Sequence, residues 1–252
     1  MAIPTMTATH HRVVATLLSP PRLAPYLRAS DCNVRAALSL YQWNVDMSSA
    51  VYKMLHLLEV FLRNAMDAEL RTWNATQIDP RTGRPHGPDW LLDPSRLVEW
   101  IVRRTEIDKA TRRAMLAVKD SSTGPRTMTH DDVLAQMMFS TWRFLLPSKD
   151  PGRQLLWREA ISLAFPNLAR PVANLVQDVD GLYRLRNRIA HLEPLLPGGA
   201  VVKGHLRAAR RVLEAVEPTA EQWLVSHQTV STVVAEMPEP ASEMPNGPLS
   251  EN

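Results

Sequence analysis

The architecture follows from residues 34–73, which read VRAALSLYQWNVDMSSAVYKMLHLLEVFLRNAMDAELRTW. Apolar side chains recur there every three or four positions, which is the spacing of one buried face on an α-helix. The spacing predicts a long helix, or two consecutive helices in register. Asn44 interrupts the stripe, and it either faces a polar partner in the core or specifies how the helix packs. The apolar positions are Ala37, Leu40, Met47, Val51, Met54, Leu58, Leu62 and Ala65.

The rest of the chain repeats this helical pattern between loops. Residues 74–89 are rich in proline and glycine and are a predicted loop, as are residues 120–128. Helices are expected over about 94–119, from Thr129 through Phe144, over 151–165, up to Pro194 and over 201–216. We therefore predict an all-α protein whose helices bury their apolar faces in a bundle with short connections.

Three segments are predicted along the chain. Residues 1–30 form a leader and a short helix, with Ser19 as the N-cap and Pro20 as the first helical residue. Residues 31–236 form the helical domain. Residues 237–252 contain four prolines and no positive charge, so this acidic tail is predicted to be disordered.

The composition excludes several classes of protein. It is 45% hydrophobic and 22% charged, which is typical of a globular chain. No apolar run reaches membrane-spanning length, and no secretory cleavage pattern follows the N-terminus. The single cysteine, Cys32, fits a reducing compartment. We expect a cytoplasmic protein without a membrane partner.

Charge is unevenly distributed along the chain. All 29 Lys and Arg residues lie within residues 1–211 with 19 of the 26 acidic residues, so this body carries +10 and residues 212–252 carry −7. A basic body is typical of proteins with an anionic partner such as nucleic acid. The histidines are scattered and there is no glycine-rich phosphate loop, so neither a metal nor another cofactor is expected.

Residues 182–194, LYRLRNRIAHLEP, concentrate three arginines, an asparagine and a histidine. Histidine transfers protons near neutral pH, and arginine stabilises charge that develops on a phosphoryl group. On a helix Asn187 and His191 share a face, whereas Arg186 and His191 lie more than about 100° apart around the axis. One helix does not direct that last pair at the same atom unless the long arginine side chain wraps around it or a second copy of the chain contributes. This geometry favours a site shared by two copies.

The run from Arg186 to Pro194 resembles the R-x(4–6)-H motif of the HEPN superfamily, and more closely its Abi-like (abortive infection) branch. Further pieces of that pattern occur in order at residues 40–44, 57–65, 139–142 and 165–166. The resemblance implies a HEPN-type up-down helical bundle with additional helices. It also implies a homodimeric, metal-independent endoribonuclease in phage defence, or a growth-arresting toxin.

In such an enzyme the 2′-hydroxyl of RNA attacks the adjacent phosphate, so RNA is the expected partner and DNA is not. Carried over, His191 would be the general acid and base, Arg186 the phosphate-stabilising cation, and Asn187 the residue that orients one of them. An antitoxin or a regulatory RNA is a further candidate partner. Two positions depart from the family pattern. Leu192 replaces a second histidine, and Glu193 replaces the tyrosine that is nucleotidylated in some members.

Several other residues are assigned supporting roles. Glu59 and Arg63 lie four apart on one face of the long helix, and we expect them to pack against the Arg186–His191 segment. Arg188 is expected to support the same segment. Candidate RNA-binding residues are Arg184, Arg207, Arg210 and Arg211.

Three alternatives stay open from the sequence. Cations near a helix C-terminus are favoured by the helix dipole, so the arginines and His191 would then serve only as capping charges. A non-catalytic HEPN module would bind RNA or a protein partner and tolerate loss of His191. A purely structural helical dimer would bind no RNA at low salt.

Overall fold

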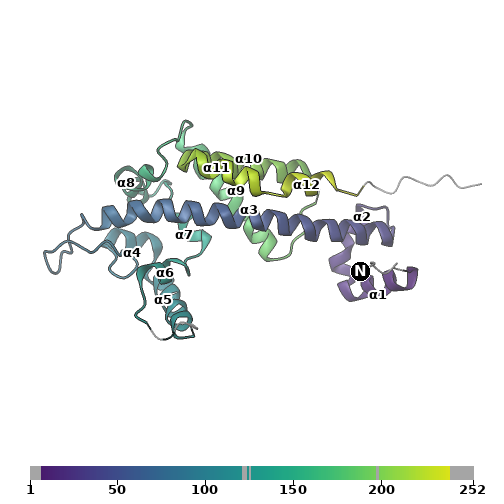
Figure 1. Ribbon diagram of the computed structural model, residues 1–252, viewed down its shortest axis with the longest axis horizontal. Helices are drawn as coiled ribbons and strands as arrows, with labels where there is room; N and C mark the ends of the chain where they lie inside the picture. Colours follow the sequence, from purple (N-terminus) through teal and green to yellow (C-terminus); the bar gives the residue numbers. More distant parts are fainter. Residues whose placement is uncertain (1–6, 121–123, 125, 197–198, 239–252) are drawn as a thin grey trace, which may run out of the picture. The chain divides into compact units, whose positions relative to one another are not determined.

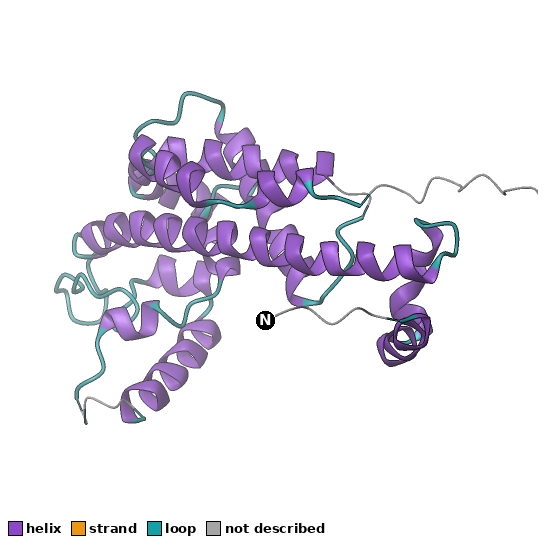
Figure 2. Ribbon diagram, turned by 45° about the vertical axis from the view of Figure 1, so that its right-hand side comes forward, coloured by secondary structure: helices purple, strands orange, loops and turns teal. Residues whose placement is uncertain are grey.

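The computed structural model describes residues 7–120, 124, 126–196 and 199–238. Within these residues the chain is all-α, and the only strand-like pairing is an isolated bridge between Ile78 and Pro85 (Figures 1 and 2). The helices are α1 (Ala8–Leu18), α2 (Pro20–Arg28), α3 (Val34–Asn74), α4 (Arg96–Val102), α5 (Arg104–Lys119), α6 (His130–Leu134), α7 (Phe139–Leu145), α8 (Pro151–Glu159), the 3₁₀ helix η1 (Ile161–Ala164), α9 (Val172–Ala190), α10 (Gly199–Val216), α11 (Pro218–His227) and α12 (Val230–Ala235).

The chain divides into two units that are discontinuous in sequence. Unit 1 comprises residues 1–54, 186–206 and 228–252, and unit 2 comprises residues 55–185 and 207–227. The divisions fall within α3, α9 and α10, so each of these helices has one part in each unit. The predicted segments 1–30, 31–236 and 237–252 stay a prediction, and residues 239–252 of the tail lie outside the described part of the chain.

Helix α3 is one continuous helix rather than two (Figure 1). The predicted apolar stripe is buried from Ala37 to Leu62, and Ala65 is half-buried. Asn44 lies within this stripe and is only 6% exposed. Its Oδ1 accepts a hydrogen bond from the backbone N–H of Leu195 at 2.7 Å. The first interpretation of Asn44, a polar partner in the core, is therefore correct.

The N-terminal segment contains two helices, α1 and α2, where one was predicted. Helix α2 begins at Pro20 as expected, but the side chain of Ser19 makes no capping hydrogen bond. The backbone of Ser19 has φ 69° and ψ 147°, which is not the extended conformation of an ordinary N-cap. Leu23 and Tyr26 provide the buried face of α2.

The helix expected over residues 94–119 is divided at Arg103. Its backbone has φ 66° and ψ 121°, so α4 ends at Val102 and α5 begins at Arg104. Residues with a Cβ rarely adopt a positive φ, and neither neighbour of Arg103 is a glycine or a proline that would signal the break.

The helix expected from Thr129 is also divided, because α6 ends at Leu134 and α7 begins only at Phe139. Thr129, where the helix was expected to begin, is the N-cap of α6. Thr129 accepts a hydrogen bond from the N–H of Asp132, and the Asp132 carboxylate accepts one from the N–H of Thr129 at 2.8 Å. Phe144, at the end of the predicted helix, is 45% exposed.

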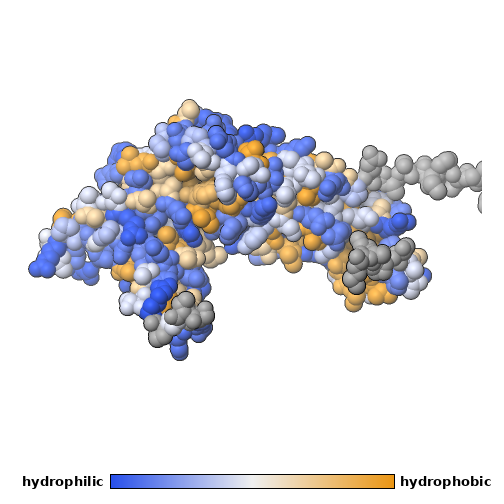
Figure 3. Space-filling model, in the orientation of Figure 1, coloured by the Kyte–Doolittle hydropathy of each residue, from blue (hydrophilic) through white to orange (hydrophobic). Residues whose placement is uncertain are grey.

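The surface is mixed in character. Figure 3 shows hydrophilic residues over much of the visible face, with smaller hydrophobic areas among them. Along the described part of the chain, no helix combines the length and the apolar content that a membrane span requires. The single cysteine, Cys32, is exposed.

Candidate functional site

The candidate site lies at the C-terminal end of α9. The preceding turns of this helix present a buried apolar face, as the spacing predicted, at Leu175, Val179, Leu182 and Leu185. Ile189 extends this face into the last turn and is 8% exposed. Because the apolar face is buried, the polar residues between its members lie at the surface or at the edge of the core.

Helix α9 ends in a Schellman turn centred on Leu192. The N–H of Glu193 donates to the carbonyl of Arg188 at 2.8 Å, and the N–H of Leu192 donates to that of Ile189 at 2.9 Å. Leu192 has φ 57°, the left-handed conformation that this turn requires and that glycine usually supplies. The helix therefore stops at Ala190, four residues before the proline that was expected to end it.

The chain beyond the turn is held by two side chains of unit 1. Arg188 Nη2 donates to the carbonyl of Pro194, and Arg188 Nε lies 3.5 Å from Glu193 Oε2. One residue further on, the N–H of Leu195 donates to the buried Asn44. Arg188 thus makes the local contacts that a supporting role for the segment needs, and Asn44 is a supporting residue that the motif did not reveal.

The three residues predicted to be catalytic are accessible. His191 is exposed on the turn, and Arg186 and Asn187 are half-buried on the last turns of α9. The backbone N–H of His191 donates to the carbonyl of Asn187 at 2.9 Å. Among the described residues of unit 1, none forms a hydrogen bond or an ion pair with the side chain of any of the three. The imidazole is therefore available to a ligand, but its orientation is not set by a neighbour in unit 1.

Glu59 and Arg63 belong to unit 2, whereas residues 186–191 belong to unit 1. Glu59 is half-buried, and Arg63 Nε donates to the side-chain oxygen of Asn64 at 3.1 Å. The expected packing of Glu59 and Arg63 against the motif stays a prediction.

Three of the four candidate RNA-binding arginines are paired with carboxylates in unit 2. Arg184 donates to Asp180, and Arg210 Nε lies 2.5 Å from Glu221 Oε1. Arg211 binds Asp178 through two hydrogen bonds of 2.6 and 2.8 Å, and this contact raises the pKa of the Arg211 guanidinium. Because these charges are balanced within the fold, they contribute less to the attraction of an external anion.

The fourth arginine, Arg207, makes no ion pair with any described residue. It lies beside Arg210 and Arg211 in the lining of a cavity of about 280 Å³, to which Glu214 and Glu221 also contribute. Of the three arginines of α10 that line this cavity, Arg210 and Arg211 are paired with carboxylates, and only Arg207 remains uncompensated among the described residues.

Among the described residues, no group of three His, Cys, Asp or Glu side chains lies close enough together to hold a metal ion. The one buried His–Asp contact there is between His130 Nε2 and Asp67 Oδ1 at 2.8 Å. The same oxygen accepts from Trp90 Nε1 at 2.8 Å. This arrangement fixes α6 against α3 within unit 2 and is a packing contact rather than an exposed site.

Comparison with known proteins identifies no relative: no family model, no curated protein and no solved structure matches the chain.

Proposed function

We propose that the chain is a metal-independent endoribonuclease of the HEPN type that works as a homodimer in phage defence or as a growth-arresting toxin. The observation that carries this proposal is the exposed imidazole of His191. It lies on a turn that is held in place by backbone hydrogen bonds and by Arg188, and no described side chain of unit 1 occupies its ring nitrogens.

The reaction is a transfer of the phosphoryl group within the RNA strand. A neutral imidazole accepts the proton of the 2′-hydroxyl as its oxygen bonds to the adjacent phosphorus. The bond from phosphorus to the 5′-oxygen breaks, and a protonated imidazole donates a proton to that oxygen. The products are a 2′,3′-cyclic phosphate and a 5′-hydroxyl. Arg186 stabilises the charge that accumulates on the non-bridging oxygens.

In the proposed homodimer, the second copy supplies a second imidazole and a second arginine to the site. The reaction uses one imidazole as a base and one as an acid, and residues 186–191 contain a single histidine. Arg186 and His191 are also five positions apart, which separates them by roughly 140° around an ideal helix. In a homodimer the second copy provides the acid and an arginine that approaches from another direction.

Incubation of cellular RNA with the protein in EDTA tests this proposal. We expect fragments with cyclic-phosphate ends from the wild type, and a loss of at least about 100-fold in rate for His191→Ala, the usual effect of removing a general acid or base. His227→Ala is the matched control, because His227 is also an exposed histidine at the end of a helix. Cleavage that survives in His191→Ala would refute the assignment of His191.

One observation favours a second function, a non-catalytic HEPN module that binds RNA. The ring of His191 has no orienting partner in unit 1, whereas catalytic histidines are commonly oriented by a second group. This module would bind RNA equally well with His191 or alanine at this position and would release no fragments. Its affinity would fall with rising salt concentration.

A further inference from the structure

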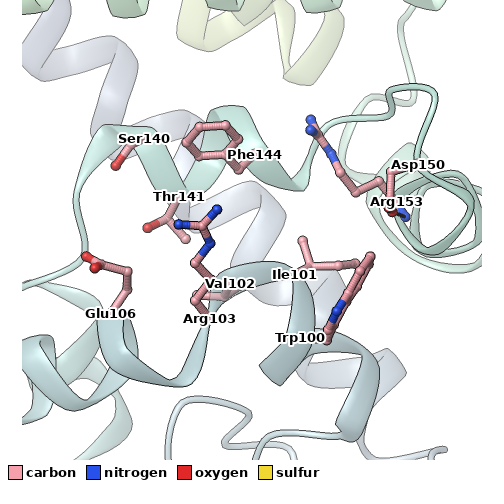
Figure 4. Close-up of a pocket in the computed structure, with 10 residues that line it drawn as sticks. All are labelled: Trp100, Ile101, Val102, Arg103, Glu106, Ser140, Thr141, Phe144, Asp150 and Arg153. Carbon is pink, nitrogen blue, oxygen red and sulfur yellow. Dashed lines mark hydrogen bonds between the residues drawn. The ribbon is translucent and has the colours of Figure 1, made fainter.

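Four helices of unit 2 surround a cavity of about 500 Å³ that lies between α4, α5, α7 and α8 (Figure 4). This volume is within the range of sites that bind small molecules. All of its lining residues belong to unit 2, whereas Arg186, Asn187 and His191 belong to unit 1. The inference from this cavity therefore does not rest on the proposed ribonuclease activity.

Two aromatic side chains line the cavity and remain largely exposed. Trp100 of α4 is 61% exposed, and Phe144 of α7 is 45% exposed. Each ring lies against a neighbour on one side. A Cβ added to Gly152 would lie 3.0 Å from a ring carbon of Trp100, and the guanidinium carbon of Arg143 lies 4.8 Å from the centre of the Phe144 ring. Exposed aromatic rings suit a flat ligand.

Two arginines at the cavity, Arg103 and Arg153, form no close ion pair with a described carboxylate. Arg103 makes no ion pair, and Figure 4 shows its guanidinium directed toward Thr141 and Phe144. Arg153 donates to the carbonyls of Leu146 and Arg143, and burial lowers the pKa of its guanidinium, while the nearby carboxylate of Asp150, which also lines the cavity, partly balances its charge. The adjacent Arg104, by contrast, is paired with Glu99 and Asp108. Arg103 is therefore the uncompensated cation of this concave site, and its guanidinium favours an anion.

A threonine also contributes to the lining of the cavity. Thr141 is only 8% exposed, and its hydroxyl forms no hydrogen bond with a described residue. Figure 4 labels Thr141 among the residues that line the cavity. The buried side-chain atoms without a partner among the described residues belong to Ser95, His130 and Trp142, so the Thr141 hydroxyl is accessible, and it is free to donate a hydrogen bond to a ligand in the cavity.

The backbone at Arg103 supports the same interpretation. Its φ of 66° would suit glycine, yet the chain carries an arginine there, and its guanidinium extends into the cavity. Strained backbone of this kind is concentrated at ligand sites, where the side chain has a use that offsets the strain.

We propose that this cavity binds a small molecule with a flat, N–H-bearing ring and an anionic group, the chemistry of a mononucleotide. The ring contacts Trp100 and Phe144, and the anionic group binds Arg103 and accepts a hydrogen bond from Thr141. Glu106 also lines the cavity, and its Oε1 binds Lys109 at 2.7 Å. Its remaining acceptor capacity suits the exocyclic amino group of adenine, guanine or cytosine, which uracil lacks.

Isothermal titration calorimetry of the full chain with AMP, GMP, CMP and UMP tests the proposal. Adenosine lacks the anion, inorganic phosphate lacks the ring, and benzoate lacks the ring N–H groups. We expect at least one amino-bearing nucleotide to bind at least tenfold more tightly than UMP, adenosine, phosphate and benzoate. No binding of any nucleotide at millimolar concentration, or benzoate binding as tightly as the best nucleotide, would overturn it.

Arg103→Gly separates ligand binding from folding. Glycine accepts the backbone conformation of residue 103, so the variant should unfold at the same temperature as the wild type or higher, while its nucleotide affinity falls at least tenfold. Arg104→Gln removes a neighbouring charge outside the cavity and should bind as the wild type does. Arg103→Asn and Thr141→Val provide second variants, each with an expected loss of threefold or more. Unchanged affinity in Arg103→Gly and Arg103→Asn would refute the site.

Discussion

Leu192 illustrates how a single residue sets the shape of the candidate active site. Its left-handed backbone reverses the chain after α9 and leaves the side chain 67% exposed. This conformation costs an L-residue roughly 1–2 kcal/mol, and little burial of the leucine side chain compensates for it. At the scale of single residues, the sequence shows that Arg186, Asn187 and His191 are close together, because they lie within six positions of the chain. It does not show the turn, because leucine carries no signal for a positive φ.

Replacement of Leu192 by glycine should stabilise the protein. Glycine adopts φ 57° without steric cost, so we expect the free energy of unfolding to rise by about 0.5–1 kcal/mol in urea denaturation. Ala190→Gly is the matched control. Ala190 is the last helical residue of α9, where glycine should lower the free energy of unfolding by about 0.5–1 kcal/mol. Equal destabilisation by both changes would mean that the Schellman turn is absent in solution.

At the scale of helices, periodicity and capping signals predict where most elements begin. The apolar stripe of α3 and the capping box at Thr129 are local patterns, and both are present in the structure. The breaks at Arg103 and after Leu134 were missed because neither is marked by a glycine or a proline in the sequence. The cavity of unit 2 was missed for the same reason, since its lining residues come from four helices and share no sequence pattern.

The capping box of α6 should make stability depend on pH. The pKa of Asp132 lies well below 3.8, chiefly because Arg126 Nη1 donates to its carboxylate at 2.6 Å, with further bonds from Thr129. A lowered pKa contributes stability that is present above about pH 4 and is lost as the pH falls below that value. We expect the melting temperature of the wild type to fall more steeply between pH 4 and pH 2 than that of Asp132→Asn.

Asp131→Asn is the control for this measurement, since it removes the neighbouring exposed carboxylate and leaves the capping box intact. It should retain the slope of the wild type below pH 4. Identical slopes for all three proteins would show that Asp132 is not bound by Arg126 and Thr129 in solution.

Two arginines of α10, Arg207 and Arg211, should contribute differently to RNA binding, because only Arg211 is paired with a carboxylate. If RNA binds there, Arg207→Gln should lower the slope of log affinity against log salt by about 0.7, the contribution of one phosphate contact to a single strand. Arg211 is held by Asp178, so Arg211→Gln should leave the slope nearly unchanged and lower the free energy of unfolding by up to about 1 kcal/mol. Filter binding between 50 and 300 mM salt measures both slopes. Equal changes in slope would contradict this distinction.

For the whole molecule, charge is the property that the sequence alone describes well. Residues 1–211 carry +10 and the remainder carries −7, although several of the arginines are matched within the fold. What the sequence cannot reveal is which charges stay available, because ion pairs such as that between Arg211 and Asp178 join residues distant in the chain. The number of arginines therefore overstates the number of cations available to an external polyanion.

Removal of residues 237–252 tests whether the acidic tail competes with RNA for the basic body. The tail contains three glutamates and no Lys or Arg, so its deletion should raise RNA affinity at low salt and have less effect at high salt, where charge is screened. Unchanged affinity at both salt concentrations would count against such competition. A tail in which Glu239, Glu243 and Glu251 are replaced by glutamine separates charge from length.

The exposed Cys32 affects how any dimer of this protein should be counted. Because it is the chain's single thiol, air oxidation can join two copies covalently whether or not they associate by themselves. Sizing by ultracentrifugation therefore needs a reductant or Cys32→Ser. The same thiol accepts one maleimide dye per chain, so single-molecule photobleaching in one or two steps would report the number of copies in a particle directly.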